Sequence, residues 1–348
     1  MPEQTPDFEA GVAYWANTEA SVDGVLGGYG ECVMGTPVPR LDATSSRLLI
    51  LSLLPSLSTI VPPHASTPAT PPRPQRPFRA LDCGAGIGRV TSTVLLPLFD
   101  LVDLVEPVPS FVKQAKRNAL AGKEGWAALH PPAGATEPAR DELTLKGARI
   151  WRAGLQHFDP LCPSRPVAGS SGVPSSSSKH VELFAHLGGS ALPWPDPARE
   201  LDLAEEGYDL VMVQWCVGHL DDPSLVEFLK RSRRALRTSR DGKVEGFIIV
   251  KENTCKDTDG AGAGRLFDDS DSSITRCCRS DKAFRDVFKQ AGLKLLRREV
   301  QQGFPQGASS FHPSLAFDPP PTRADLLICV GRVGSRAELF PVVAYALQ

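Results

Sequence analysis

Three glycines at alternating positions follow a short apolar run. The run and its turn read LDCGAGIGR over residues 81–89, with glycine at 84, 86 and 88. Such a turn lets the backbone approach a ligand closely, because glycine has no Cβ. The spacing G-x-G-x-G is one residue short of the dinucleotide pattern G-x-G-x-x-G, and the Lys-Ser/Thr end of a phosphate loop is missing. A pyrophosphate-binding turn is therefore disfavoured. The turn either approaches another kind of ligand or is purely structural.

A carboxylate stands where a ribose-binding group is expected. Glu106 ends the run LVDLVE, 22 residues after Gly84. In sheets that bind nucleotides, an acidic residue about 20 residues beyond the glycine turn accepts hydrogen bonds from ribose hydroxyls. The alternative is a solvated strand end before Pro107. The turn and the carboxylate together favour a cofactor that contains a nucleoside.

The elements that must position these residues alternate along the chain. Periodicity predicts strands at 79–82, 101–106, 150–155, 208–215 and 246–251, with a final antiparallel pair at 293–300 and 340–347. Helices are predicted at 45–57, 88–98, 109–120, 223–236 and 281–291. The order indicates a doubly wound α/β sheet with helices on both faces, whose ligands bind at the carboxyl ends of the strands.

Several stretches have the composition of loops. Proline, serine and other polar residues dominate 61–78, 121–148, 162–200 and 307–336, although 324–333 could form an extra strand. We interpret these stretches as insertions between elements of a single domain spanning 1–348, because what remains has the size of one α/β domain.

Composition excludes several classes of protein. The formal net charge of −2 over 348 residues provides no field that would bind nucleic acid or an acidic membrane. None of the eight cysteines forms a CxxC pair, so no zinc site is predicted and a reducing compartment is favoured. The polar N-terminus resembles no signal peptide, and the apolar stretch 48–61 is too short to span a bilayer. A monomer in the cytoplasm, and also in the nucleus, is expected.

Longer blocks of sequence resemble the protein α-N-terminal methyltransferases, a family within the class I S-adenosylmethionine-dependent methyltransferases. The blocks are YW at 14–15, VDGVLGGYG at 22–30, LDCGAGIGRVTSTVLLPLF at 81–99, GLQ at 154–156, VQWCVGHLDD at 213–222, IVKEN at 249–253, LFDDSDSS at 266–273 and AGLKLL at 291–296. The glycine turn is generic, whereas GGYG, QWCVGHL and DDSDSS are much more specific. The resemblance implies a seven-stranded Rossmann-like sheet, an N-terminal helical cap at 1–60 over the active site, and methylation of N-termini that read Xaa-Pro-Lys/Arg.

The resemblance also assigns residues to the site. Those implied to line S-adenosylmethionine are Trp15, Gly84, Gly86, Arg89, Glu106, Pro107, Val108, Leu155, Gln156 and Gln214. Those implied to line the peptide channel are Leu26, Gly27, Trp215, Asp268, Ser273 and Phe340, and the implied catalytic residues are Asp271, His219 and Asn253. Relatives often have Asp at position 106 and Tyr at position 340, and the loop at 258–265 is enlarged here.

The chemistry of methyl transfer suits these residue types. An in-line displacement at a sulfonium needs a neutral amine, yet an α-amino group with a pKa of roughly 7.7–8.0 is mostly protonated at neutral pH. A histidine such as His219 can accept that proton, and a carboxylate such as Asp271 can attract the ammonium and accept the proton in turn. Alternatives remain open, because His219 could be a structural histidine and DDSDSS could be a helix N-cap. An EF-hand is disfavoured because DDSDSS lacks the required Gly and Glu.

Other functions remain as alternatives to a peptide methyltransferase. A class I methyltransferase acting on a small molecule would share the glycine turn and Glu106. A binding protein that retains the cofactor or peptide site without catalysis is the alternative from another class, and a dehydrogenase is weakest because the glycine spacing is wrong.

Overall fold

The computed structural model describes residues 6–30, 32–33, 36–58, 76–131, 146–165, 167, 181–189, 192–257, 279–304, 330–332, 337–339 and 341–348. Its helices are α1 (Phe8–Ala16), α2 (Val22–Val25), α3 (Val38–Leu53), α4 (Leu96–Leu98), α5 (Pro109–Leu120), α7 (Asp222–Arg234) and α8 (Asp281–Gln290). Shorter helical turns are η1 (Pro55–Leu57), the π-helical η2 (Thr91–Leu95), η3 (Glu124–Leu129) and η4 (Val217–His219).

Within the described ranges, eight strands form one sheet in the order β6-β5-β4-β3-β7-β8-β12-β9. They are β3 (Arg79–Cys83), β4 (Leu101–Glu106), β5 (Gly147–Ala153), β6 (Val181–Gly188), β7 (Leu210–Gln214), β8 (Phe247–Asn253), β9 (Leu295–Val300) and β12 (Val342–Leu347). Two small hairpins pair β1 (Cys32–Val33) with β2 (Thr36–Pro37) and β10 (Val330–Arg332) with β11 (Ala337–Leu339). The non-sequential strand order is that of a doubly wound sheet.

The chain divides into two compact units, here called unit 1 and unit 2. Unit 1 contains residues 1–42, 213–230 and 249–347, and unit 2 contains residues 43–212, 231–248 and 348.

In unit 2, the apolar strands predicted around the glycine turn pair as expected. β4 runs parallel to both β3 and β5, and all its residues are buried, as is typical of a strand covered on both faces. The carboxylate of Asp103, in the middle of β4, is fully buried and accepts hydrogen bonds from the side chains of Arg79, Trp151 and Tyr208. A buried carboxylate requires such partners, and this set joins β3, β4 and β5 at one point.

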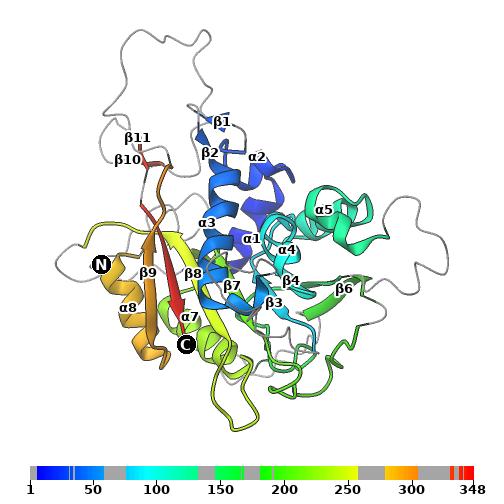
Figure 1. Ribbon diagram of the computed structural model, residues 1–348. Coiled ribbons are helices and arrows are strands. Elements are labelled where there is room, and N and C mark those ends of the chain that lie inside the picture. The colour runs from blue at the N-terminus through cyan, green and yellow to red at the C-terminus, as the bar shows by residue number, and fades with distance from the viewer. Residues whose placement is uncertain are drawn as a thin grey trace, which may run out of the picture. The chain divides into compact units, whose positions relative to one another are not determined.

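In unit 1, the amphipathic helix α8 packs on the C-terminal strand. Phe284 and Phe288 of α8 lie with ring centroids 5.5 and 5.2 Å from that of Tyr345 in β12. β12 pairs antiparallel with β9, as predicted for the terminal pair, and α8 lies beside both strands (Figure 1). Ser280 caps α8 by accepting the N–H of Ala283.

The sequence prediction was wrong at one edge of the sheet. The span 162–200 was predicted to be loop-like, but its residues 181–188 form β6, which pairs antiparallel with β5. The sheet therefore has one strand more than the seven predicted. The low-complexity run before residue 181 hid a strand whose pattern is weak, because it lies at an edge and most of its residues are at least partly exposed.

Other predicted boundaries moved by a few residues. The helix predicted at 45–57 begins at Val38 and ends at Leu53, and η1 follows it. Most of the predicted insertions at 61–78 and 307–336 lies outside the described residues, and the span 121–148 contains η3. The single-domain organisation stays a prediction.

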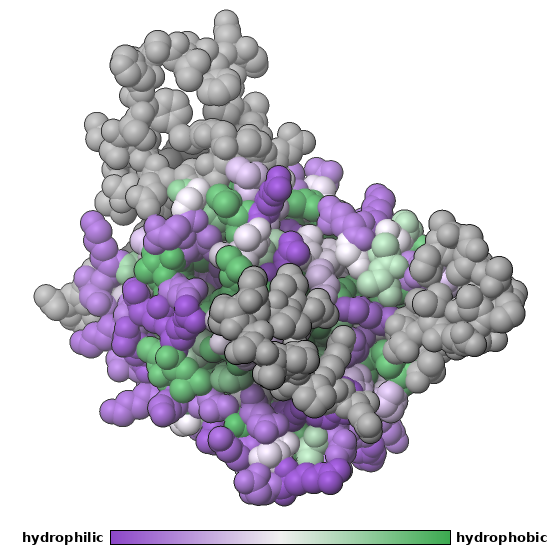
Figure 2. All heavy atoms as spheres, viewed as in Figure 1, coloured by the Kyte–Doolittle hydropathy of each residue, from purple (hydrophilic) through white to green (hydrophobic). Residues whose placement is uncertain are grey.

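The described residues contain no helix that is long and apolar enough to cross a membrane. On the face shown in Figure 2, apolar side chains are scattered among hydrophilic ones.

Candidate functional site

The glycine turn after β3 adopts a backbone conformation that other residues avoid. Gly84, Gly86 and Gly88 have φ angles of 63°, 56° and 79°. At Gly88, an added Cβ would lie 2.5 Å from a ring atom of Trp126, so the closeness of packing also requires glycine there. The positive φ angles favour glycine at all three positions, and packing against Trp126 also requires it at Gly88.

Glu106 ties this turn to the end of β4. The N–H of Gly86 donates to Oε2 of Glu106 over 2.8 Å, and the N–H of Val108 donates to Oε1 over 2.8 Å. The side chain is 5% exposed, and burial raises the pKa of Glu106 to about 7, although the two N–H groups act in the opposite direction. The structure thus brings together three of the residues predicted to line the cofactor.

The hydrogen-bond acceptor positions of Glu106 fit a ribose. An ionised carboxylate offers about four lone-pair positions, and two of these accept the backbone N–H groups of the turn and of α5. The remaining two can accept hydrogen bonds from a vicinal diol. Pro107 separates Glu106 from Val108 and is half-buried, while Val108 is 3% exposed at the N-cap of α5.

Arg89 follows the turn and is mostly buried. Burial raises the pKa of Asp82 to about 6, although the hydrogen bond from Thr91 and the charge of Arg89 act in the opposite direction. The hydroxyl of Thr91 donates to the carboxylate of Asp82 over 2.6 Å. The end of β3 and the start of η2 therefore share one polar cluster.

Arg231 fixes the loop that carries Leu155 and Gln156. The guanidinium donates to the carbonyl oxygens of Leu155 over 2.9 Å and of Phe158 over 3.1 Å, and it lies 3.4 Å from that of Gln156. Leu155 is buried and Gln156 is half-buried. Both predicted cofactor residues therefore lie in a loop held through its backbone, and Arg231 was missed because a helix arginine carries no local signal.

In unit 1, the structure brings Trp15 to His219. The indole Nε1–H donates to Nε2 of His219 over 2.9 Å, and the ring centroids are 6.3 Å apart in an edge-on arrangement. The sequence predicted Trp15 as a residue folded over the cofactor and did not predict this hydrogen bond.

The turn that carries His219 is clamped by Arg279. This guanidinium is 1% exposed and donates to the carbonyl oxygens of Val217 over 3.0 Å and of Leu220 over 2.6 Å, while its Nε pairs with Asp222 over 2.8 Å. The carbonyl oxygens on either side of His219 are therefore held by one buried side chain. Arg279 was not predicted from the sequence, because nothing in its local sequence distinguishes it from a surface arginine.

Glu252 approaches the same turn from the end of β8. Glu252 is 5% exposed, and burial raises its pKa to about 7, although hydrogen bonds from the N–H groups of Asn253, Val217 and Cys216 lower it. Asn253 is the last residue of β8, is half-buried, and donates its N–H to Glu252 Oε1 over 3.1 Å.

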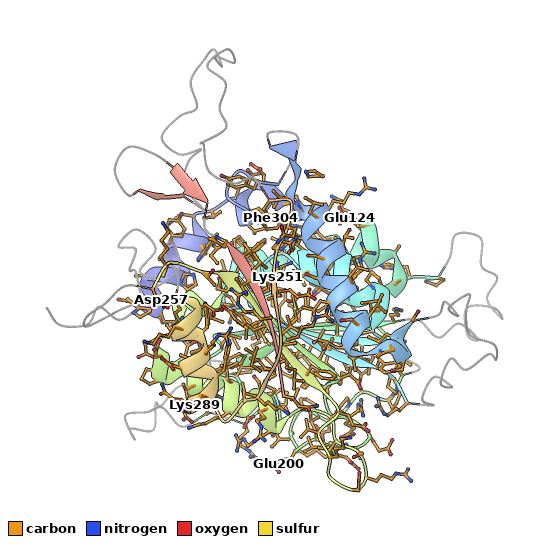
Figure 3. All side chains as sticks on the ribbon, turned by 60° about the vertical axis from the view of Figure 1, so that its left-hand side comes forward. Glu124, Glu200, Lys251, Asp257, Lys289 and Phe304 are labelled. Carbon is orange, nitrogen blue, oxygen red and sulfur yellow. The ribbon has the colours of Figure 1, made fainter. Side chains whose placement is uncertain are left out.

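Trp215 directly follows β7 in a left-handed conformation. Its φ is 52°, a value that costs a bulky residue on the order of 1–3 kcal/mol and occurs most often at functional sites. Its N–H donates to the carbonyl of Lys251 over 3.1 Å, and its ring centroid lies 6.4 Å from that of Phe304. Phe304, labelled in Figure 3, is a neighbour that the sequence did not predict.

Gln214, the last residue of β7, lies against a buried ion pair. Its Nε2 lies 2.9 Å from both oxygens of Asp42, and Lys251 Nζ lies 2.5 Å from Asp42 Oδ1. Asp42 and Lys251 are 0% and 3% exposed in their side chains, and Lys251 lies among the packed side chains of Figure 3.

The structure describes only some of the remaining residues that were predicted to bind the peptide. Leu26 is buried at the end of α2, and Gly27 follows it with a φ of 59°. Asp268, Asp271, Ser273 and Phe340 lie outside the described residues, so their predicted roles stay predictions. No group of three or more His, Cys, Asp or Glu side chains that could hold a metal ion occurs among the described residues.

The doubly wound fold is shared with a known S-adenosylmethionine-dependent methyltransferase. A SAM-dependent methyltransferase from Leishmania major has the same fold, with a TM-score of 0.53 and 24% identity over 98% of this chain and 82% of that one. This confirms the predicted fold class.

The particular family follows from the sequence. The family described as AdoMet dependent proline di-methyltransferases matches residues 3–131 and 196–313, and the chain belongs to this family. Alpha N-terminal protein methyltransferase 1 of Arabidopsis thaliana is 32% identical over 87% of this chain and 77% of its own length. N-terminal Xaa-Pro-Lys N-methyltransferase 1-B of Xenopus laevis is 30% identical over 88% of this chain and 92% of its own length. S-adenosylmethionine is therefore the cofactor, as predicted.

Proposed function

We propose that this chain methylates the α-amino group of proteins whose N-termini read Xaa-Pro-Lys or Xaa-Pro-Arg. The membership in the proline di-methyltransferase family carries the proposal, and relatives named for Xaa-Pro-Lys termini support the substrate. Bound S-adenosylmethionine supplies a methyl group activated on a sulfonium.

The protein's own residues have two tasks in this reaction. In unit 2, the glycine turn and Glu106 offer backbone and carboxylate acceptors to the nucleoside. In unit 1, His219 is the proton acceptor for the substrate ammonium, and it suits this role because its Nε2 already accepts a hydrogen bond and so carries no proton. Arg279 holds the turn of His219, which limits the positions that the imidazole can take.

Asp271, Asp268, Ser273, Asn253, Trp215 and Phe340 complete the proposed peptide site. Three aspartates in the run at 268–271 would attract a substrate whose third residue is Lys or Arg. His219 and Asp271 share the proton-accepting role in this proposal, with Asp271 first attracting the ammonium.

Mass spectrometry tests the proposal directly. A peptide beginning Ser-Pro-Lys is incubated with the protein and S-adenosylmethionine, and methyl groups should appear on the N-terminal nitrogen. The same peptide with an acetylated N-terminus, and one with Gln in place of Pro, serve as controls and should stay unmodified. Absence of methylation on the free Ser-Pro-Lys peptide would reject the proposed substrate in favour of a small-molecule acceptor or of binding without catalysis.

We also propose a monomer that binds neither nucleic acid nor membranes and that resides in the cytoplasm and nucleus. The net charge of −2 and the absence of a CxxC pair from the sequence support this setting. Light scattering after size exclusion tests the monomer, and microscopy of a fluorescently tagged chain tests the location.

A further inference from the structure

The buried contact among Asp42, Lys251 and Gln214 determines which end of the Gln214 amide faces Asp42. Asp42 in α3 is fully buried, and Lys251 in β8 lies 2.5 Å from its Oδ1. An ion pair this close keeps the carboxylate charged, and an ionised carboxylate only accepts hydrogen bonds. The group of Gln214 that faces both carboxylate oxygens at 2.9 Å must therefore be the NH2 of its side-chain amide.

The amide oxygen of Gln214 then has to point away from Asp42. Gln214 is 5% exposed, and among the residues that the structure describes its Oε1 has no hydrogen-bond partner. A buried acceptor of this kind costs free energy unless a donor reaches it. Gln214 also ends β7, and ligands of doubly wound sheets bind beyond the carboxyl ends of the strands.

We propose that Asp42, held by Lys251, is a positioning residue that fixes the amide of Gln214 so that Oε1 accepts an N–H from the ammonium group of a ligand. An ammonium is the favoured donor because a hydrogen bond to a charged donor is the stronger kind, and both molecules in the reaction carry an amine. The sources are the methionyl ammonium of the cofactor and, resting on the proposed function, the N-terminal amine of the peptide.

Isothermal titration measures the preference for an amine without requiring turnover. S-adenosylhomocysteine is compared with its deamino analogue, and a Ser-Pro-Lys peptide with an analogue that carries a hydroxyl in place of the N-terminal amine. The wild-type protein should prefer one of the amine-bearing ligands by about tenfold, as loss of one charge-assisted hydrogen bond predicts. The pair that shows the preference identifies the source.

The variant Asp42→Asn with Lys251→Met removes the fixed acceptor and leaves no unpaired buried charge. Asn can face Gln214 with either its oxygen or its nitrogen, so the amide is free to turn and the amine preference should fall to about twofold or less. Tyr345→Phe is the matched control in unit 1, because it removes one side-chain hydrogen bond to Asp281 and should keep the full preference.

Gln214→Leu provides a second variant if the double variant does not fold, and it should abolish the same preference while preserving binding of the deamino ligand. A full preference in either folded variant, or none in the wild-type protein, overturns the inference. A preference for the cofactor amine together with an unmethylated peptide would reject the proposed substrate and leave the positioning role intact.

Discussion

The indole N–H of Trp15 donates to Nε2 of His219 over 2.9 Å, across 204 residues of sequence. Because an indole nitrogen can only donate, the neutral imidazole must carry its proton on Nδ1. The nitrogen that would accept a proton from the substrate is therefore already in its basic form. In the proposed reaction, this nitrogen would become available once an amine replaces the indole as its hydrogen-bond donor.

The first prediction concerns this histidine. His219→Ala should lower kcat by about 10²-fold or more, as is typical when a general base is removed, and should change the dissociation constant of S-adenosylhomocysteine little. Single-turnover kinetics and isothermal titration measure the two quantities. Trp15→Phe keeps the imidazole and removes only the indole donor, so its kcat should fall much less. An equal loss of kcat in both variants would show that the hydrogen bond between Trp15 and His219 matters, and not proton transfer to His219.

The second prediction concerns the pH dependence of cofactor binding. Burial raises the pKa of Glu106 to about 7, and only the ionised carboxylate accepts hydrogen bonds with both oxygens. The affinity for S-adenosylhomocysteine should therefore be constant above about pH 7 and fall as the pH drops below it, by up to about tenfold per unit. Titrations from pH 5.5 to 8.5 measure this. Glu106→Gln should bind more weakly at high pH and show a flat profile, apart from any residual slope due to Asp82, whose pKa burial raises to about 6.

The third prediction concerns stability. Burial raises the pKa of Glu252 from 4.5 in the unfolded chain to about 7 in the folded one. The folded protein thus binds more protons between these values, and the free energy of unfolding should decrease as the pH rises through this window. For Glu252 the decrease is on the order of 3 kcal/mol. Urea unfolding at both ends of the window measures it, and Glu252→Gln should show a smaller decrease; an unchanged decrease would assign it to other groups.

The fourth prediction separates two costs of losing a glycine. Gly88 and Gly292 both have positive φ angles, of 79° and 71°, but only at Gly88 would a Cβ meet another atom, at 2.5 Å from Trp126. Gly292→Ala should cost roughly 1–2 kcal/mol for the backbone alone. Gly88→Ala should cost clearly more, because Trp126 must also shift, and chemical unfolding of both variants measures the difference. Equal costs would show that Trp126 moves freely.

The sequence predicted the elements around the glycine turn well, because their signals are local. The glycine turn, the strand before the turn and Glu106 all lie within residues 79–106, and β4 and α5 have the predicted bounds. Other parts of the site depend on contacts between distant positions. In the sequence Asp42 is an ordinary polar residue ahead of the predicted helix, and its partners Gln214 and Lys251 follow 172 and 209 residues later.

Tertiary packing also explains the shifted start of α3. The residues at 38–44 include Pro, Asp and Thr, which have weak helix propensity, so the prediction began the helix at residue 45. In the structure Val38 and Asp42 are buried, and their contacts stabilise a helix that propensity alone does not favour.

Asp42 and Lys251 neutralise one another where neither charge could be solvated. Losing one partner leaves an uncompensated buried charge, whereas losing both together can be nearly neutral. The two positions should therefore change together during divergence: lineages that replace the acid in α3 should also replace the lysine in β8. In those lineages the amide at the end of β7 would have lost its fixed direction, so its position should vary as well.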